Sequence, residues 1–223
     1  PIGAFVELGY FTFRTCLATN VNGYVDVPEG DCQMKRGGVS VTLDRIAELA
    51  LIPVIRIEDA GDAQDLVAAL TAAGLPQTEI TFRTAAAEDA IRHIASAFPD
   101  VVLGAGTVLS ADQARRAVEA GAQFVVSPGF NPHTVDWCIE HQVPIIPGVA
   151  TPTEIEMALD KGLKVLKFFP AEVLGGVRML KALSGPYGDV KFVPTGGVNA
   201  RNLADYLGLP NVHACAGSWL APS

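Results

Sequence analysis

The chain has 223 residues, of which 49% are hydrophobic, and a mean hydropathy of +0.31, so it can bury a large core. Its 16 basic and 24 acidic residues give a net charge of −8, which argues against a nucleic-acid-binding surface. The sequence contains no run of about 18 apolar residues and no basic-then-apolar start, so we expect neither a membrane span nor a secretory signal.

The first part of the chain, residues 1–38, differs in composition from the rest. It is rich in Gly, Val, Thr, Asn and aromatic residues, and Asn22-Gly23 is typical of a hairpin turn. We interpret residues 1–38 as an N-terminal extension of unknown role and residues 39–223 as the folded domain. Because exposed aromatic residues are unfavourable, we expect the extension to pack on the domain or on a neighbouring subunit.

From about residue 42 the sequence alternates short apolar runs with helix-like stretches. The predicted strands cover residues 52–57, 77–82, 101–105, 124–126, 144–147, 165–169, 191–194 and 212–216. The predicted helices cover residues 62–73, 86–98, 111–120, 134–141, 153–161, 173–183 and 200–207. Strands that alternate with single helices form parallel βαβ units. Because a flavodoxin-like sheet needs only about five strands, we predict a single-domain (β/α)8 TIM barrel.

The second predicted strand carries polar residues on one face. The odd positions hold Gln77, Glu79, Thr81 and Arg83, and the even positions hold Thr78, Ile80 and Phe82. A polar face on a central strand is costly unless it lines a cavity, so we predict that it faces the barrel interior. Arg83 lies about 13 Å beyond Glu79 at strand rise, at the rim where barrel enzymes bind substrates. The alternative is an edge strand with one face in water.

Lys167 lies in the strand-like run 164–169, which ends at Pro170. Lys164 and Lys167 are an odd number of residues apart, so they point to opposite faces of the strand. Lys167 then shares its face with Val165 and Phe169, where an ammonium group is disfavoured and a neutral, nucleophilic amine is favoured. This is the environment of a Schiff-base lysine. The alternative is a lysine at a strand end whose charged head reaches water.

Small residues follow four of the predicted strands. These segments are Gly104-Ala105-Gly106-Thr107, Ser127-Pro128-Gly129, Thr195-Gly196-Gly197 and Ala216-Gly217-Ser218. Glycines after the seventh and eighth strands are where this architecture commonly binds phosphate through backbone N–H groups. We therefore predict a phosphate site at the last two segments.

The four cysteines, Cys16, Cys32, Cys138 and Cys215, show neither CxxC spacing nor a metal-ligand cluster. We interpret them as free thiols, with a Cys16–Cys32 bridge as the alternative. No metal site is expected.

Several motifs together resemble the 2-keto-3-deoxy-6-phosphogluconate (KDPG) aldolases. The matching segments, in order, cover residues 79–84, 104–109, 127–129, 167–172, 194–198 and 217–220. The resemblance extends over about residues 42–220 and includes the related 4-hydroxy-2-oxoglutarate (KHG) aldolases. It implies a class I aldolase without metal or cofactor, which cleaves a phosphorylated keto acid in the Entner–Doudoroff pathway. It also implies a cytoplasmic homotrimer.

The resemblance assigns a role to each matching residue. Lys167 corresponds to the imine-forming lysine and Glu79 to the acid/base. Arg83 and Thr107 correspond to the carboxylate-binding groups, and Thr195 to a position that influences stereoselectivity. The phosphate-binding residues are Gly196, Gly197, Gly217 and Ser218, and weaker candidates for the site are Arg56 and Pro128.

Three features depart from the family pattern. Ala216 replaces a usual glycine, and its methyl group would narrow the phosphate loop. The sequence ends at Ser223, where the family usually continues into a final helix, so we expect a truncated C-terminal end with apolar strand surface left uncovered. Residues 1–38 match nothing in the family. A lineage-specific arm, a trimer-interface extension and a fused segment stay open as explanations.

Two other functions compete with aldol cleavage. A catalytically idle trimeric barrel used as an assembly scaffold would suit the unusual termini, but the retained Lys167, Glu79 and Arg83 argue against it. A tautomerase would use the amine of Pro1 as a base, but the residues that follow lack its βαβ pattern. Processing of the N-terminus is the favoured explanation of Pro1.

Overall fold

The computed structural model describes residues 39–221. The predicted extension at residues 1–38, its expected packing and the Cys16–Cys32 alternative lie outside the described residues. Cys138 and Cys215 are free thiols, as predicted, and both are buried. None of the helices formed by residues 39–221 is long and apolar enough to cross a membrane.

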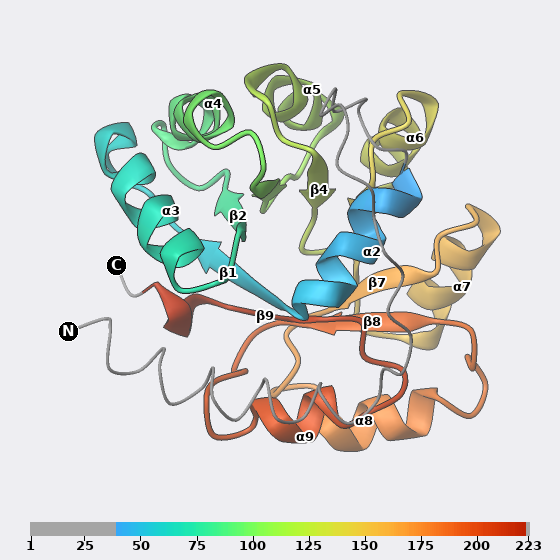
Figure 1. The fold of residues 1–223 in the computed structure, drawn as a ribbon. Coiled ribbons are helices and arrows are strands. Elements are labelled where there is room, and N and C mark those ends of the chain that lie inside the picture. The colour runs from blue at the N-terminus through green and yellow to red at the C-terminus, as the bar shows by residue number, and fades with distance from the viewer. Residues whose placement is uncertain (1–38, 222–223) are drawn as a thin grey trace, which may run out of the picture. The chain divides into compact units, whose positions relative to one another are not determined.

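Parallel strands alternate with helices along the described chain (Figure 1). The strands are β1 (Leu51–Ile55), β2 (Gln77–Thr81), β3 (Val102–Gly106), β4 (Phe124–Val126), β5 (Ile145–Ile146), β6 (Gly148–Val149), β7 (Val165–Phe168), β8 (Lys191–Pro194) and β9 (Cys215–Gly217). The helices are α2 (Val39–Leu49), α3 (Ala63–Ala72), α4 (Ala87–Ala97), α5 (Ala111–Ala120), α6 (Pro132–Glu140), α7 (Pro152–Asp160), α8 (Gly176–Leu183) and α9 (Leu203–Leu207). Two short 3-10 helices are η1 (Ala60–Asp62) and η2 (Ser218–Leu220).

The strands form two parallel sheets, with the orders β5-β4-β3-β2-β1-β9 and β6-β7-β8. The predicted strand 144–147 corresponds to β5 alone, and β6 was not predicted. Only Pro147, which lacks an N–H donor, separates the two short strands. Isolated parallel bridges pair Phe192 with Val212 and Thr195 with Ala216, which places β9 beside β8. The described chain is therefore an α/β fold of parallel strands with all helices except α2 on the outside (Figure 1).

Alternation along the strands separates an outer core from an inner one. Outward-facing residues such as Ile80 and Phe168 pack under the surrounding helices. Inward-facing residues form a separate apolar cluster whose buried members are Ile46, Ile52, Val102, Phe124, Val126, Ile146, Val193, Ala214 and Ala216. Further along the strands, toward their carboxyl ends, the inward-facing positions are polar, and the candidate site lies there.

Helix α2 was not predicted from the sequence. It lies inside the ring of outer helices in Figure 1 and buries Ile46 completely in the inner cluster. Leu43 and Leu49 recur at a spacing of three residues around Ile46 and form the apolar stripe typical of such a helix. The Leu43 carbonyl lies 2.9 Å from Nε2 of His213, which ties the helix to the segment before β9.

Truncating the buried side chain of α2 should destabilise the whole domain. We expect Ile46→Ala to lower the free energy of unfolding by about 2–5 kcal/mol, because it removes transfer energy and leaves a cavity. Val41 lies on the same helix but is 60% exposed, so Val41→Ala should change stability by less than about 0.5 kcal/mol. Chemical denaturation measures both variants. Equal effects would show that α2 does not depend on its inner contacts.

Candidate active site

A lysine and a glutamate meet in the interior of the fold. Glu79 lies on β2 and is 1% exposed, and Lys167 lies on β7 and is 5% exposed. The Lys167 Nζ lies 3.9 Å from the Glu79 Oε1. Because β2 and β7 belong to different sheets, the two side chains meet across the space between the sheets. The prediction that both residues face the interior is confirmed.

Both alternative interpretations of these residues are wrong. β2 is not an edge strand, since Glu79 is in register with Val54 on one side and Gly104 on the other. The side chain of Lys167 is only 6% exposed, so its charged head does not reach bulk water. Lys164, on the opposite face, is exposed and pairs with Asp189 at 3.4 Å.

Glycine makes room for the Glu79 carboxyl group. A Cβ added at Gly106 would overlap this carboxyl group, so only glycine fits there. Burial raises the pKa of Glu79 above its ordinary value of 4.5, and the nearby Lys167 charge opposes this shift to a lesser extent. The Glu79 Oε1 accepts no hydrogen bond from a described residue. The carboxyl group is therefore available to a bound molecule and can hold a proton at higher pH than an exposed one.

Phe169, which alternation places on the same face as Lys167, lies close to the amine. The Phe169 ring centroid lies 5.1 Å from the Lys167 Nζ, within cation–π range. On the neighbouring strand Gly148 is in register with Lys167. A Cβ at Gly148 would overlap the Pro128 carbonyl, so this glycine lets the loop after β4 approach the lysine strand. Gly148 was not predicted as a site residue, and its only sequence signal is its place directly after Pro147.

The predicted carboxylate-binding residues follow β2 and β3, which are neighbours in the sheet. Arg83 is exposed and Thr107 is half-buried, with a φ of 55° that turns the chain sharply after β3. Pro128 is half-buried beyond β4. Arg56 reaches Glu58 at 2.6 Å on the exposed rim, so its charge is partly offset by that of a neighbour. All of these residues lie at the carboxyl ends of their strands.

The two predicted phosphate-binding segments follow adjacent strands. The bridge between Thr195 and Ala216 brings the loops after β8 and β9 side by side. Gly196 and Gly197 have φ angles of 93° and 84°, a left-handed conformation that exposes successive N–H groups and suits an anion. Thr195 is 7% exposed and its hydroxyl donates to the Val193 carbonyl at 3.3 Å.

The second segment contains Gly217 and the exposed Ser218, which begins η2. A Cβ at Gly217 would overlap the Trp219 ring, so the glycine is required by packing. Ala216, which the sequence suggested would narrow the loop, is 1% exposed and belongs to the inner apolar cluster. Its methyl group therefore contributes to the inner core.

Among residues 39–221, no cluster of three or more His, Cys, Asp or Glu side chains has the arrangement of a metal site. What these described residues bring together is a buried amine beside a buried carboxyl group, with two glycine-containing loops that follow the adjacent strands β8 and β9.

Comparison with known proteins extends these observations. A family model for KDPG and KHG aldolase matches residues 43–223. The 2-dehydro-3-deoxy-phosphogluconate aldolase of Treponema pallidum is 53% identical over 180 residues, which are 81% of this chain and 86% of that protein. The KDPG aldolase structure from Legionella pneumophila, with pyruvate captured as a covalent carbinolamine, matches with a TM-score of 0.80 and 40% identity, over 85% of this chain and 90% of that one. The Zymomonas mobilis enzyme with 3-phosphoglycerate gives a TM-score of 0.78 and 40% identity, over 81% and 87% of the two chains.

The raised pKa of Glu79 predicts a pH-dependent cost to stability. The folded protein holds the Glu79 proton more tightly than the unfolded chain does. Protonated Glu79 therefore adds to the free energy of unfolding below pH 4.5, and this stabilisation is lost as the pH rises through the raised pKa. Glu79→Gln does not titrate and should gain stability relative to wild type between pH 4.5 and pH 8. Denaturation at both pH values measures the difference, and a constant or shrinking difference would contradict the assignment.

Proposed function

The chain belongs to the KDPG and KHG aldolase family, and we propose that it is a class I aldolase that cleaves KDPG into pyruvate and glyceraldehyde 3-phosphate. The observation that carries the proposal is the buried amine of Lys167, 3.9 Å from the carboxyl group of Glu79. The family also includes KHG aldolases, so we propose cleavage of 4-hydroxy-2-oxoglutarate into pyruvate and glyoxylate as a second activity.

In the first stage of the proposed reaction the neutral Lys167 amine attacks the keto carbon of the substrate. The carbinolamine that forms loses its hydroxyl group as water when Glu79 donates a proton, and a protonated imine remains. Glu79 is suited to this step because burial raises its pKa above the ordinary value and so favours the protonated form that donates the proton.

In the second stage Glu79 accepts the proton of the C4 hydroxyl group. The C3–C4 bond breaks, its electrons move into the imine to give an enamine, and glyceraldehyde 3-phosphate leaves as the aldehyde. Protonation of the enamine at C3 and hydrolysis of the imine release pyruvate and restore Lys167. The one carboxyl group acts alternately as acid and base, so protons balance over the cycle.

The two ends of the substrate have separate proposed binding groups. Arg83 and Thr107 hold the carboxylate next to the keto group, a role suited to the guanidinium fork. Thr195, at the start of the loop after β8, contacts the region of the substrate that differs between stereoisomers. The phosphate lies against the backbone of two loops, whose proposed contact residues are Gly196, Gly197, Gly217 and Ser218. Arg56 and Pro128 take subsidiary positions at the rim.

The architecture and assembly form further parts of the proposal. We infer that the strands close into a (β/α)8 barrel, supported by the β8–β9 bridges and by the contact of Lys167 with Glu79 across the interior. A homotrimer in the cytoplasm rests on the family resemblance, and residues 1–38 are proposed as an N-terminal extension of unknown role. An idle scaffold is disfavoured, because burying two ionisable groups lowers stability and a scaffold does not need them.

Replacing Lys167 should abolish catalysis. Arginine stays protonated and methionine has no amine, so neither Lys167→Arg nor Lys167→Met can form the imine. We expect no pyruvate release from KDPG and no irreversible adduct after pyruvate and borohydride treatment, read by mass spectrometry. Lys164→Arg and Lys164→Met are matched controls on the opposite, exposed face and should keep both activities. An adduct on either Lys167 variant would contradict the assignment.

Replacing Glu79 by glutamine should slow the reaction without preventing substrate binding. The amide keeps the shape of the side chain but transfers no proton, so we expect kcat for KDPG cleavage to fall by roughly 10²–10⁴-fold. Exchange of the pyruvate methyl protons with solvent should fall in parallel. Glu119→Gln, on the exposed surface of α5, serves as the control. Proton exchange at the wild-type rate would assign the proton transfer to another residue.

A further inference from the structure

Glu172 is a charged residue close to the proposed site that the reaction does not use. It lies five residues after Lys167, in the loop between β7 and α8. Its backbone N–H donates to the Gly196 carbonyl at 3.1 Å, and the N–H of Ala171 donates to the Thr195 carbonyl at 2.8 Å. The loop that carries Glu172 is thereby hydrogen-bonded directly to the loop proposed to bind phosphate.

The Glu172 side chain fills the space beside two glycines. A Cβ added at Gly197 would lie 2.5 Å from the Glu172 Cγ, so Gly197 packs directly against the stem of this side chain. A Cβ added at Gly176, the first residue of α8, would lie 2.8 Å from both the Glu172 Oε1 and the Tyr206 hydroxyl oxygen. Glu172 is therefore a wedge between the start of α8 and the phosphate loop.

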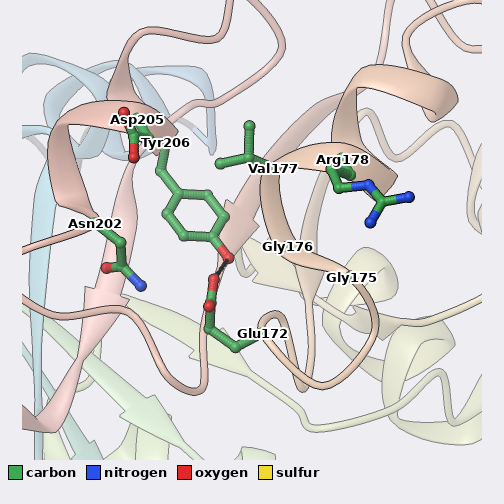
Figure 2. Close-up of a pocket in the computed structure, with 8 residues that line it drawn as sticks. All are labelled: Glu172, Gly175, Gly176, Val177, Arg178, Asn202, Asp205 and Tyr206. Atoms are coloured by element: carbon green, nitrogen blue, oxygen red, sulfur yellow. Dashed lines mark hydrogen bonds between the residues drawn. The ribbon is translucent and has the colours of Figure 1, made fainter.

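Tyr206 holds the Glu172 carboxylate in place through a hydrogen bond. It lies on α9, is completely buried, and its hydroxyl donates a hydrogen bond to the Glu172 Oε1 (Figure 2). Burial and this hydrogen bond to a carboxylate raise the pKa of Tyr206, so the phenol stays a donor throughout the physiological range. A buried tyrosine requires such a partner, and here the partner is the residue that supports Gly197.

Two asparagine side chains from the segment before α9 also contact Gly197. The side-chain amides of Asn199 and Asn202 donate to the Gly197 carbonyl at 2.9 Å and 3.1 Å. These bonds orient the carbonyl, whereas Glu172 limits how far the glycine can move toward α8. The left-handed backbone of Gly196 and Gly197 is thus supported by contacts from the segment before α9 and from the β7–α8 loop.

We propose that the Glu172–Tyr206 pair is a positioning device for the phosphate loop and that it selects phosphorylated over unphosphorylated keto acids. The inference rests on the proposed aldolase function and adds a specificity role for two residues that touch neither the amine nor the reacting carbon. The hydroxyl of Tyr206 holds the Glu172 carboxylate toward α9. Without it, the wedge beside Gly197 loosens and the carboxylate is free to turn toward a bound phosphate dianion, which it would repel.

The test is Tyr206→Phe, which removes one hydroxyl group and little else. We expect KM for KDPG to rise by about tenfold, equivalent to one lost hydrogen bond to a charged group, with kcat changed by less than about twofold. Both parameters for 4-hydroxy-2-oxoglutarate, which has no phosphate, should stay within about twofold of wild type, because its carboxylate end and Lys167 are untouched.

Two further variants separate positioning from general stability. Tyr187→Phe removes another tyrosine hydroxyl that donates to a carboxylate, that of Glu156 at 3.0 Å, and should leave KM for both substrates unchanged. Glu172→Gln retains an oxygen that can accept the hydrogen bond from Tyr206, so KM for KDPG should stay within about threefold of wild type.

The outcomes test the specificity role of the Glu172–Tyr206 pair separately from the proposed aldolase function. Equal losses for both substrates in Tyr206→Phe, or no change for either, would overturn the specificity role of the pair. The proposed function is tested separately by wild-type turnover of KDPG and by borohydride trapping at Lys167. An active wild type with an unresponsive Tyr206→Phe variant would therefore refute only the further inference.

Discussion

The structure depends on holding an amine and a carboxyl group together where water is scarce. Removing two ionisable groups from water costs several kcal/mol, and their attraction at 3.9 Å repays only part of it. The apolar cores offset the rest of this free-energy cost. Helices cover the outer faces of the strands, and the inner cluster, which includes Ile46 of α2, fills the interior next to the site. The two inward-facing residues therefore lower the stability of the fold, and the raised pKa of Glu79 has the same cause, which is burial.

Glycine shapes this site as much as the reactive groups do. Gly106 leaves the volume that the Glu79 carboxyl group occupies, Gly148 admits the loop after β4, and Gly197 admits Glu172. A side chain at any of these positions would overlap a neighbouring residue, so the geometry of the site requires glycine at all three. The positive φ angles of Gly196 and Gly197 are a further feature that glycine permits, and they support the proposal that the backbone N–H groups of this loop bind phosphate.

Much of this arrangement could be predicted from the sequence because alternation along strands is a strict rule. The odd spacing of Lys164 and Lys167 placed them on opposite faces, and the polar positions of β2 placed Glu79 inside. Helix α2 was missed because its apolar stripe lies next to a segment of different composition. The Glu172–Tyr206 contact was also beyond reach, since a hydrogen bond between residues 34 apart depends on how α9 packs and leaves no periodic pattern.

The two halves of the proposed site are built by different means, and the proposed reaction assigns the chemistry to one half and the choice of substrate to the other. Lys167 and Glu79 stand on strands β7 and β2, whose backbones are paired on both sides. The phosphate segments are loops, and their shape depends on side chains such as Asn202 and Glu172 that come from outside the strands. In the proposed reaction, changes in the loops would alter which aldehyde portion is accepted, while the paired strands would keep Lys167 and Glu79 in place. A family that acts on both phosphorylated and unphosphorylated keto acids needs such a division, because the pyruvyl end of both substrates is the same.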